Sequence, residues 1–234
     1  MGKGLFITGT DTGVGKTFVA GALASLLRAR RIDVGVMKPV ETGCPRVDGR
    51  LQPQDALYLK EKAGTVDSLD EICPYPLEMP AAPSVAADAE GIAIDLDQIA
   101  VRFRRLAARH QLTLVEGAGG ILVPLTDTAD YTDLIRMLDV PVLLVAVASL
   151  GTINHTLLTW HWARHLRLAV LGVVVNNPTG PPAPSEQANL QALTKRLPTS
   201  FLGYVPYLSE PSVDLSTVER SLGLDQLLEC LELV

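Results

Sequence analysis

A glycine-rich stretch near the N-terminus, GTDTGVGKT, carries residue types suited to binding a chain of phosphates. Gly13 and Gly15 allow backbone N–H groups to turn toward an anion, and a helix that begins at Lys16 adds its positive N-terminal dipole. The Lys16 ammonium can reach phosphate oxygens, and the Thr17 hydroxyl can ligate Mg²⁺. The usual pattern has a glycine where this chain has Thr10. The order of strand, glycines, Gly-Lys-Thr and helix still predicts a working phosphate-binding loop rather than a glycine-rich turn without a ligand.

Polar residues also follow three other apolar runs and mark the start of a helix. Lys38 follows VGVM, and a lysine that faces bound phosphates stabilises the charge of a transferring group. Glu116 closes LTLV, where an acid can orient Mg²⁺. Asn176 and Asn177 close VLGVVV, and an amide both donates to and accepts from a purine edge. Asp55, in QPQDALYL, is either a Mg²⁺ ligand or a helix N-cap. The residues alone leave the simpler roles open: a solvated lysine, a turn acid, a plain turn and a cap.

Strand-like and helix-like segments alternate along the chain, and this alternation decides where the polar residues meet. The strand candidates are nearly unbroken apolar runs, typical of parallel strands buried on both faces: LFIT, VGVMKPV, LTLVEGAGG, VPVLLVAVAS, VLGVVVNN and the weaker FLGYVPYL. Helical patterns lie between them, at about 16–31, 95–110, 131–138, 153–167 and 185–197. We expect one α/β domain over residues 1–234, P-loop NTPase-like, with a doubly wound, mostly parallel sheet and helices on both faces. Ligands then gather beyond the carboxyl ends of the strands.

Composition and charge argue against several classes of protein. The chain has 234 residues, of which 47% are hydrophobic and 20% charged, so it can bury a substantial core. Its net charge of −6 argues against a nucleic-acid or anionic-membrane partner. The three scattered cysteines suggest neither a disulfide framework nor a zinc site, and no run resembles a signal peptide or a membrane span. His155, His161 and His165 share one predicted helix without a neighbouring acid, which favours a structural or interface helix. We expect a cytoplasmic protein.

Five motifs, taken together, resemble the dethiobiotin synthetase family in order and in spacing. They are GTDTGVGKT, MKPVETG, VEGAGGILVPL, SLGTINH and VVNN, and the resemblance runs from Leu5 to about Leu208. It implies an ATP- and Mg²⁺-dependent ligase that carboxylates 7,8-diaminononanoate with CO₂ or bicarbonate. A carbamate and then a carbamic–phosphoric anhydride form, and ring closure gives dethiobiotin, ADP and phosphate.

The resemblance also assigns roles to residues. It implies that Thr12, Lys16 and Lys38 are catalytic, with Thr12 facing the carbamate and Lys16 touching both carbamate and γ-phosphate. The metal set is Thr17, Asp55 and Glu116. Substrate contacts come from Thr12, Lys38, Thr42, Gly151, Thr152 and Asn154. Nucleotide contacts come from Gly13, Val14, Gly15, Lys16, Thr17, Asp55, Glu116, Gly117, Ala118, Gly119, Asn176 and Asn177, and less securely from Val205, Pro206 and Tyr207.

A homodimer is implied as well, with each active site shared between the two subunits. SLGTINH borders the interface in the family and receives the substrate carboxylate from the other subunit, although Asn154 could simply cap its helix. The chain departs from the family at Asn189, where a tyrosine often meets that carboxylate. The main alternative is a partition-type nucleotide-switch ATPase. That class usually carries a lysine where this chain has Asp11, and it favours a basic surface.

Overall fold

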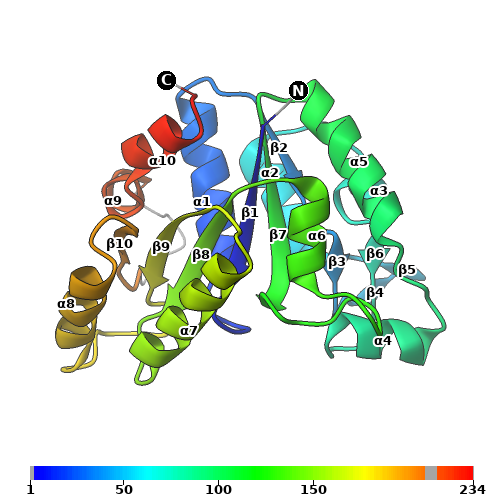
Figure 1. The fold of residues 1–234 in the computed structure, drawn as a ribbon. Helices are drawn as coiled ribbons and strands as arrows, with labels where there is room; N and C mark the ends of the chain where they lie inside the picture. The colour runs from blue at the N-terminus through cyan, green and yellow to red at the C-terminus, as the bar shows by residue number, and fades with distance from the viewer. Residues whose placement is uncertain (1–2, 209–214, 234) are drawn as a thin grey trace.

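The centre of the molecule is a six-stranded sheet with the strand order β10-β9-β8-β1-β7-β2 (Figure 1). The computed structural model describes residues 3–208 and 215–233. Every strand pairs with its neighbours in parallel, which confirms the predicted sheet. The strands are β1 (Lys3–Gly9), β2 (Val34–Met37), β7 (Leu112–Gly120), β8 (Val142–Val147), β9 (Val170–Asn176) and β10 (Phe201–Val205).

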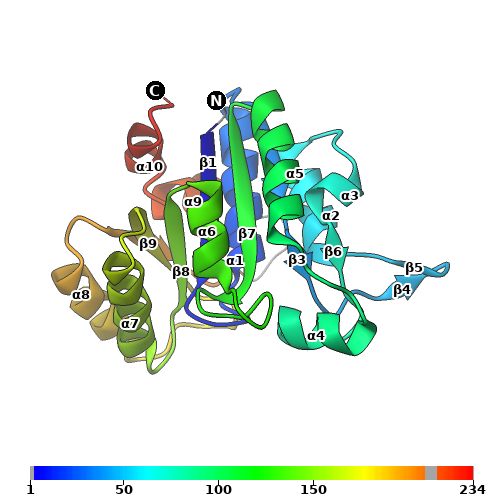
Figure 2. The ribbon, with the colours of Figure 1, turned by 45° about the vertical axis from the view of Figure 1, so that its right-hand side comes forward.

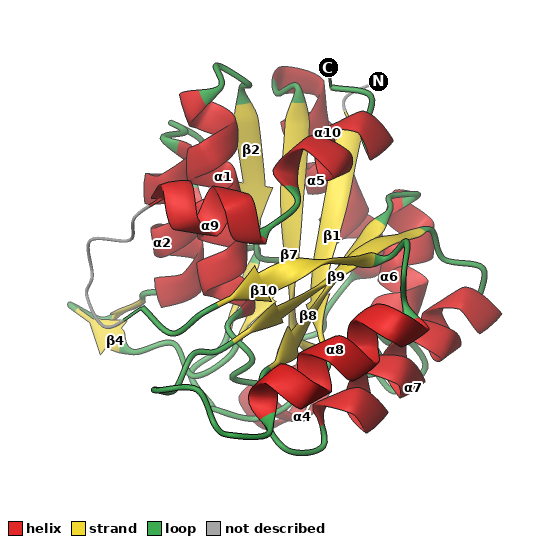
Figure 3. Cartoon of the chain, turned by 90° about the vertical axis from the view of Figure 1, so that its left-hand side faces the viewer, coloured by secondary structure: helices red, strands yellow, loops and turns green. Residues whose placement is uncertain are grey.

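Helices cover both faces of this sheet, as the alternating pattern predicted. One face packs against α1 (Lys16–Ala29), α2 (Gln54–Ala63), α9 (Leu215–Ser221) and α10 (Leu224–Cys230). The other packs against α5 (Leu96–Arg109), α6 (Tyr131–Leu138), α7 (Thr152–His165) and α8 (Glu186–Arg196). Figure 3 shows α1, α2 and α9 on one side of the sheet and α6, α7 and α8 on the other.

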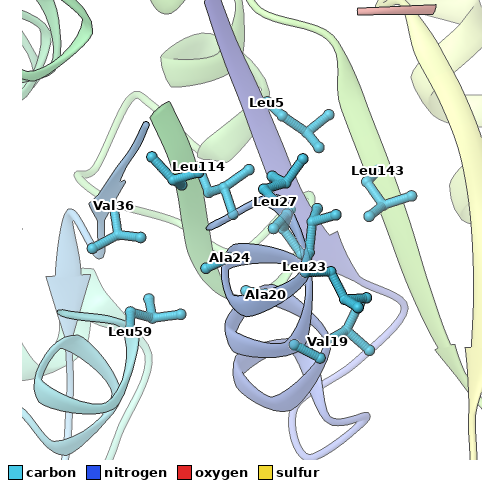
Figure 4. Close-up of a cluster of buried hydrophobic side chains, with 14 of the residues drawn as sticks. Leu5, Val19, Ala20, Leu23, Ala24, Leu27, Val36, Leu59, Leu114 and Leu143 are labelled. Carbon is cyan, nitrogen blue, oxygen red and sulfur yellow. The ribbon is translucent and has the colours of Figure 1, made fainter. Parts of the chain in front are cut away.

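Helix α1 supplies the largest block of one core and holds the phosphate loop at its start. Leu23 and Leu27 are buried and face the sheet near Leu5, Leu114 and Leu143 (Figure 4). This contact ties α1 to three adjacent strands, β7, β1 and β8. The predicted end of this helix, near Arg31, is two residues too late. Arg31 has a φ of 63°, in the left-handed region, which does not continue a right-handed helix.

Several short elements beside β2 were not predicted. They are β3 (Val40–Glu41), β4 (Arg46–Val47), β5 (Arg50–Leu51), α3 (Leu69–Ile72), β6 (Tyr75–Pro76) and α4 (Pro83–Glu90). The predicted strand VGVMKPV divides at Pro39, which has no N–H to donate to a neighbour, so β2 ends at Met37 and β3 begins at Val40. The antiparallel pair β4 and β5 projects away from the body of the molecule (Figure 2).

The carboxyl ends of the six strands lie at the bottom of Figure 1, and the register aligns their last residues. Gly9 at the end of β1 pairs with Gly120 at the end of β7, and Asn176 at the end of β9 pairs with Val205 at the end of β10. The segments that follow the strands therefore meet at one rim. Over residues 3–208 and 215–233, no helix is both long enough and apolar enough to cross a membrane.

Candidate active site

The phosphate loop connects β1 to α1 and leaves the first turn of the helix open. Gly15 is the N-cap of α1 with a φ of 89°, and no side chain caps the helix. The Lys16 Nζ donates to the Asp11 carbonyl oxygen at 2.9 Å, so this lysine lies along the loop. Thr10, in the place of the usual glycine, has no left-handed backbone, and its N–H donates to the Val145 carbonyl oxygen at 2.9 Å. Thr10 thus extends the pairing of β1 with β8, which needs no glycine.

Lys38 lies between two carboxylates beside this loop. Its Nζ is 2.6 Å from Glu116 Oε1 and 2.8 Å from Asp55 Oδ2. Lys38 is only 3% exposed, so the interpretation as a solvated lysine is wrong. Burial acts to lower the pKa of Lys38, but the charges of Glu116 and Asp55 outweigh it and hold the pKa above its usual value. The ammonium therefore stays charged.

At Lys16, the effect of burial on the pKa outweighs that of the neighbouring carboxylates. Burial, and then the charge of Lys38, lower the pKa of Lys16 to about 8. The carboxylates of Glu116, Asp55 and Asp11 act against this shift and do not cancel it. Two lysines and two acids are thus brought together, and one of the lysines lacks a carboxylate partner at bonding distance within the described residues.

The two carboxylate oxygens of Glu116 differ in their hydrogen bonding. Its Oε1 accepts from the Thr17 hydroxyl at 2.8 Å as well as from Lys38. Its Oε2 is buried without a hydrogen-bond partner, which is costly for a carboxylate that is 1% exposed. Hydroxyl and carboxylate oxygens are ligands that Mg²⁺ prefers, so this group fits the metal. No three His, Cys, Asp or Glu side chains gather into a metal site in the described part of the chain.

A cavity of about 660 Å³ opens over these residues. Of the predicted site residues, the structure places these along it: Thr12, Gly13, Gly15, Lys16, Thr17, Lys38, Thr42, Asp55, Glu116, Ala118 and Gly119. Of the contacts predicted in the phosphate loop and in β7, Val14 and Gly117 do not line it and are buried. The segment 80–83 and Val123 also line the cavity, and sequence reasoning missed them because neither carries a charged or polar group.

Glu41 is the one charged residue of the cavity that sequence reasoning overlooked, although it lies inside the KPVETG motif. Its carboxylate accepts the backbone N–H groups of Asp55 and Ala56 at 2.9 and 3.0 Å. Burial raises the pKa of Glu41 to about 7, against the effect of these N–H groups.

The alternative interpretation of Asp55 as an N-cap is wrong: Pro53 holds that position, and Asp55 lies inside α2.

A second cavity, of about 190 Å³, lies at the ends of β9 and β10. It is lined by Phe18, Asn176, Asn177, Pro178, Pro206, Tyr207 and Leu208. Asn176 donates from Nδ2 to the Val14 carbonyl oxygen at 2.9 Å and so ties β9 to the phosphate loop. The Asn177 side chain donates to the Gly180 carbonyl oxygen and to Glu186 Oε2 and accepts the Thr179 N–H, so it ties its loop to the start of α8. Val205, another predicted contact, is fully buried, and only its carbonyl oxygen reaches this region, where it accepts the Asn177 N–H.

Gly151, Thr152 and Asn154 lie at the start of α7 and line neither cavity. Gly151 is the N-cap with a φ of 96°, and no side chain caps the helix, so the alternative role of Asn154 as a cap is wrong. Asn154 is exposed, and Leu150 beside it is 90% exposed. Asn189 lies in the first turn of α8 and lines neither cavity.

The similarity to known proteins agrees with this geometry. A family model described as an AAA domain matches residues 3–212. The ATP-dependent dethiobiotin synthetase BioD of Anaeromyxobacter dehalogenans is 44% identical over 94% of this chain and 96% of its own length. The enzyme of the same name from Bacillus licheniformis is 41% identical over 90% of this chain and 88% of its own length.

Among solved structures, the MinC:MinD cell division protein complex of Aquifex aeolicus aligns with a TM-score of 0.57 at 17% identity, over 94% of this chain and 87% of the other. A ParA family ATPase from Chlorobium tepidum aligns with a TM-score of 0.54 at 12% identity, over 97% of this chain and 93% of the other. These two likenesses show the P-loop fold alone. The sequence relatives go further: this chain belongs to the dethiobiotin synthetase family.

Proposed function

We propose that this chain carboxylates 7,8-diaminononanoate with CO₂ and closes the ureido ring at the expense of ATP, giving dethiobiotin, ADP and phosphate. The proposal is carried by the meeting of Lys16, Lys38 and Glu116 in one cavity, in a chain 44% identical to a dethiobiotin synthetase. The volume of about 660 Å³ lies within the usual range of small-molecule sites.

The central difficulty of this reaction is that one anion attacks another. A carbamate formed on one amine must approach the γ-phosphate, and the second amine then displaces phosphate as the ring closes. The charged Lys38 and the loop residue Lys16 face the same cavity as the open N-terminus of α1. Together they offset the repulsion and hold the reactants in line, which supplies most of the catalysis in phosphoryl transfer. Thr12 and Thr42 line this cavity and would orient the carbamate and substrate.

Magnesium fits the acidic side of the cavity. Thr17, Glu116 and Asp55 would hold it, and when bound it would neutralise charge on the phosphate oxygens. Glu116 offers its unpartnered Oε2, while Lys38 already occupies Oε1. The chain therefore keeps Lys38 beside the metal ligands, where it can reach the transferring phosphoryl group.

The smaller cavity suits the nucleobase. Asn176 supplies an amide at its edge, while Phe18, Pro206 and Tyr207 supply flat apolar surface. Because the Asn176 Nδ2 already bonds the loop at Val14, its amide links the base end of the nucleotide to the phosphate end. We infer that residues 1–234 act as one domain, since a single sheet supports both cavities.

The decisive experiment measures release of ADP with each substrate omitted in turn. We expect ADP release to require both the diamine and bicarbonate, with dethiobiotin formed in equal amount. ADP release that ignores the diamine would instead favour a nucleotide-switch ATPase. The residue Asp11, in place of that class's lysine, already argues against this alternative.

We further propose a homodimer in which each active site uses Asn154 of the other subunit. Asn154 is exposed and does not line the cavity of its own chain. Leu150, Leu158 and Trp162 are exposed apolar residues at or on α7, and such residues are typical of the buried centre of an interface. A two-fold dimer would form two equivalent sites.

Subunit mixing tests the shared site. Lys16→Ala and Asn154→Ala chains, each severely impaired alone, are mixed in equal amounts and allowed to exchange. Half of the dimers then carry both lesions in one site and an intact second site, so about a quarter of wild-type activity should return. Activity that stays at the level of the two parents, with exchange confirmed, contradicts the shared site.

A further inference from the structure

Glu41 occupies a fixed position between the lysine of the site and the start of α2. Its backbone carbonyl oxygen accepts the Leu77 N–H at 2.8 Å and the Cys44 thiol at 3.3 Å. Glu41 pairs with Pro76 in the short β3–β6 ladder, and the residue is 6% exposed. The side chain is therefore held from a rigid support rather than from a mobile loop.

The carboxylate of Glu41 performs the task that an N-cap residue usually performs. Both of its oxygens are used: Oε1 accepts the Asp55 N–H at 2.9 Å, and Oε2 accepts the Ala56 N–H at 3.0 Å. The residue at the N-cap itself, Pro53, has no side-chain acceptor. The start of α2 is thus capped by a residue 14 positions earlier in the chain.

This cap acts directly on Asp55. The Asp55 backbone is bonded to Glu41, and its Oδ2 is 2.8 Å from Lys38 Nζ. Between Glu41 and Asp55 the chain makes a long excursion that includes the projecting β4–β5 pair. Ala56 and Leu59 pack α2 against the core beside α1, and the first turn of α2 depends on Glu41 for two of its free N–H groups.

We propose that Glu41 is a positioning residue, which sets the place of Asp55 relative to Lys38 and Glu116 by capping α2 from across the 42–54 excursion. The inference rests on the proposed Mg²⁺ role of Asp55. Glu41 acts through the backbone of its neighbour and contacts no metal itself. Outer residues of this kind typically change metal affinity or activity by about 10- to 100-fold when they are removed.

Glu41→Ala and Glu41→Gln test this role, and Asp95→Ala is a matched control. Asp95 also accepts two backbone N–H groups at a helix start, those of Asp97 and Gln98 at α5, and it lies outside both cavities. Loss of either cap should lower the Tm by about 2 to 8 °C. Only Glu41→Ala should raise the Mg²⁺ concentration for half-maximal rate, by about tenfold or more. Glu41→Gln keeps one acceptor oxygen and should lie between Glu41→Ala and wild type.

A double-mutant cycle separates action through Asp55 from action on the substrate. In the Asp55→Ala background, Glu41→Ala should change turnover and Mg²⁺ dependence less than twofold, because the residue that it positions is gone. Full additivity of the two losses overturns the proposal. So does a Mg²⁺ titration of Glu41→Ala that matches that of Asp95→Ala.

The proposed function and this inference fail in different ways. If wild-type protein forms no dethiobiotin, the proposed reaction is wrong. The Mg²⁺ dependence of binding a fluorescent ATP analogue then replaces turnover as the readout in every variant. If wild-type protein forms dethiobiotin and the Mg²⁺ dependence of Glu41→Ala is unchanged, only the positioning role is wrong.

Discussion

Replacing Lys16 with methionine should stabilise the protein in the absence of nucleotide while removing its affinity for ATP. Methionine has nearly the same length and keeps the apolar contacts of the lysine stem. The pKa of Lys16 falls from 10.5 to about 8 on folding. A shift of this size lowers stability by about 3 kcal/mol wherever the lysine is charged in both states. The variant also loses the bond to Asp11 at 2.9 Å, worth about 1 kcal/mol. The net expectation is a gain of about 2 kcal/mol at pH 7.

The pH dependence distinguishes this cause from a change in packing. Because the folded pKa is lowered, the unfolded chain binds more protons between pH 8 and 10.5, and wild-type stability rises with pH across that window. The stability cost of burying the charged Lys16 is fully present below pH 8 and disappears above pH 10.5. The advantage of Lys16→Met should therefore shrink between pH 7 and pH 9.5, by about 2 kcal/mol.

Urea unfolding of both proteins, without nucleotide and with a chelator of Mg²⁺, measures these differences. At a nucleotide concentration 100 times the wild-type Kd, with Mg²⁺ restored, only wild type should gain about 2.7 kcal/mol, which reverses the order of stability. Two results would refute the reasoning: a variant that is no more stable than wild type at pH 7, or a gain that is the same at pH 7 and pH 9.5.

Three further variants probe the other contacts of the site. Lys38→Ala should leave ATP affinity nearly unchanged but raise the activation free energy of turnover by about 2 to 4 kcal/mol, measured by ADP release, and near-normal turnover would contradict the assignment. Gly15→Ala should abolish ATP binding in calorimetric titrations, because the φ of Gly15 is 89° and an added Cβ would clash with the side-chain amide of Asn176. Gly13→Ala places its Cβ within 4 Å of no other atom and should cost only about 1 to 2 kcal/mol of backbone strain. Equal losses of ATP affinity in the two variants would contradict this reasoning. Tyr204→Phe removes the phenol that donates to a buried carboxylate of α8 and should lower stability by about 1 to 3 kcal/mol in thermal unfolding, so an unchanged Tm would argue against that bond.

The sequence predicted the sheet and the phosphate loop because both depend on local patterns. Apolar runs identify strands buried on both faces, and Gly-Lys-Thr after such a run identifies the loop. The convergence of Lys38 and Glu116 was predictable too, since Lys38 follows β2, Glu116 ends the apolar run of β7, and the carboxyl ends of parallel strands share one rim. What stayed open was how these groups pair. The position of Lys38 between two acids depends on register and on the return of α2, which no local pattern specifies.

Contacts between distant segments account for what the sequence analysis missed. Glu41 caps a helix 14 residues away, so no capping pattern places it there. The pairs β3–β6 and β4–β5 have two residues in each strand, too few for a period to appear. Asn176 and Asn177 are adjacent and identical in type, yet Asn176 bonds the phosphate loop, whereas Asn177 bonds its own turn and Glu186 of α8. Only the direction of each side chain separates their roles.

The strand order has a consequence for how the site is assembled as the chain is synthesised. The first 120 residues contain β2, β7 and β1, which are neighbours in the sheet, and with them Thr17, Lys38 and Glu116. The later strands β8, β9 and β10 then add outward from β1 in the order of their synthesis. The cluster of Thr17, Lys38 and Glu116 can therefore form on a half-sheet before the strand that carries Asn176 exists. The smaller cavity forms only once β9 and β10 have joined the sheet, so any ligand that spans both cavities requires the complete six-stranded sheet.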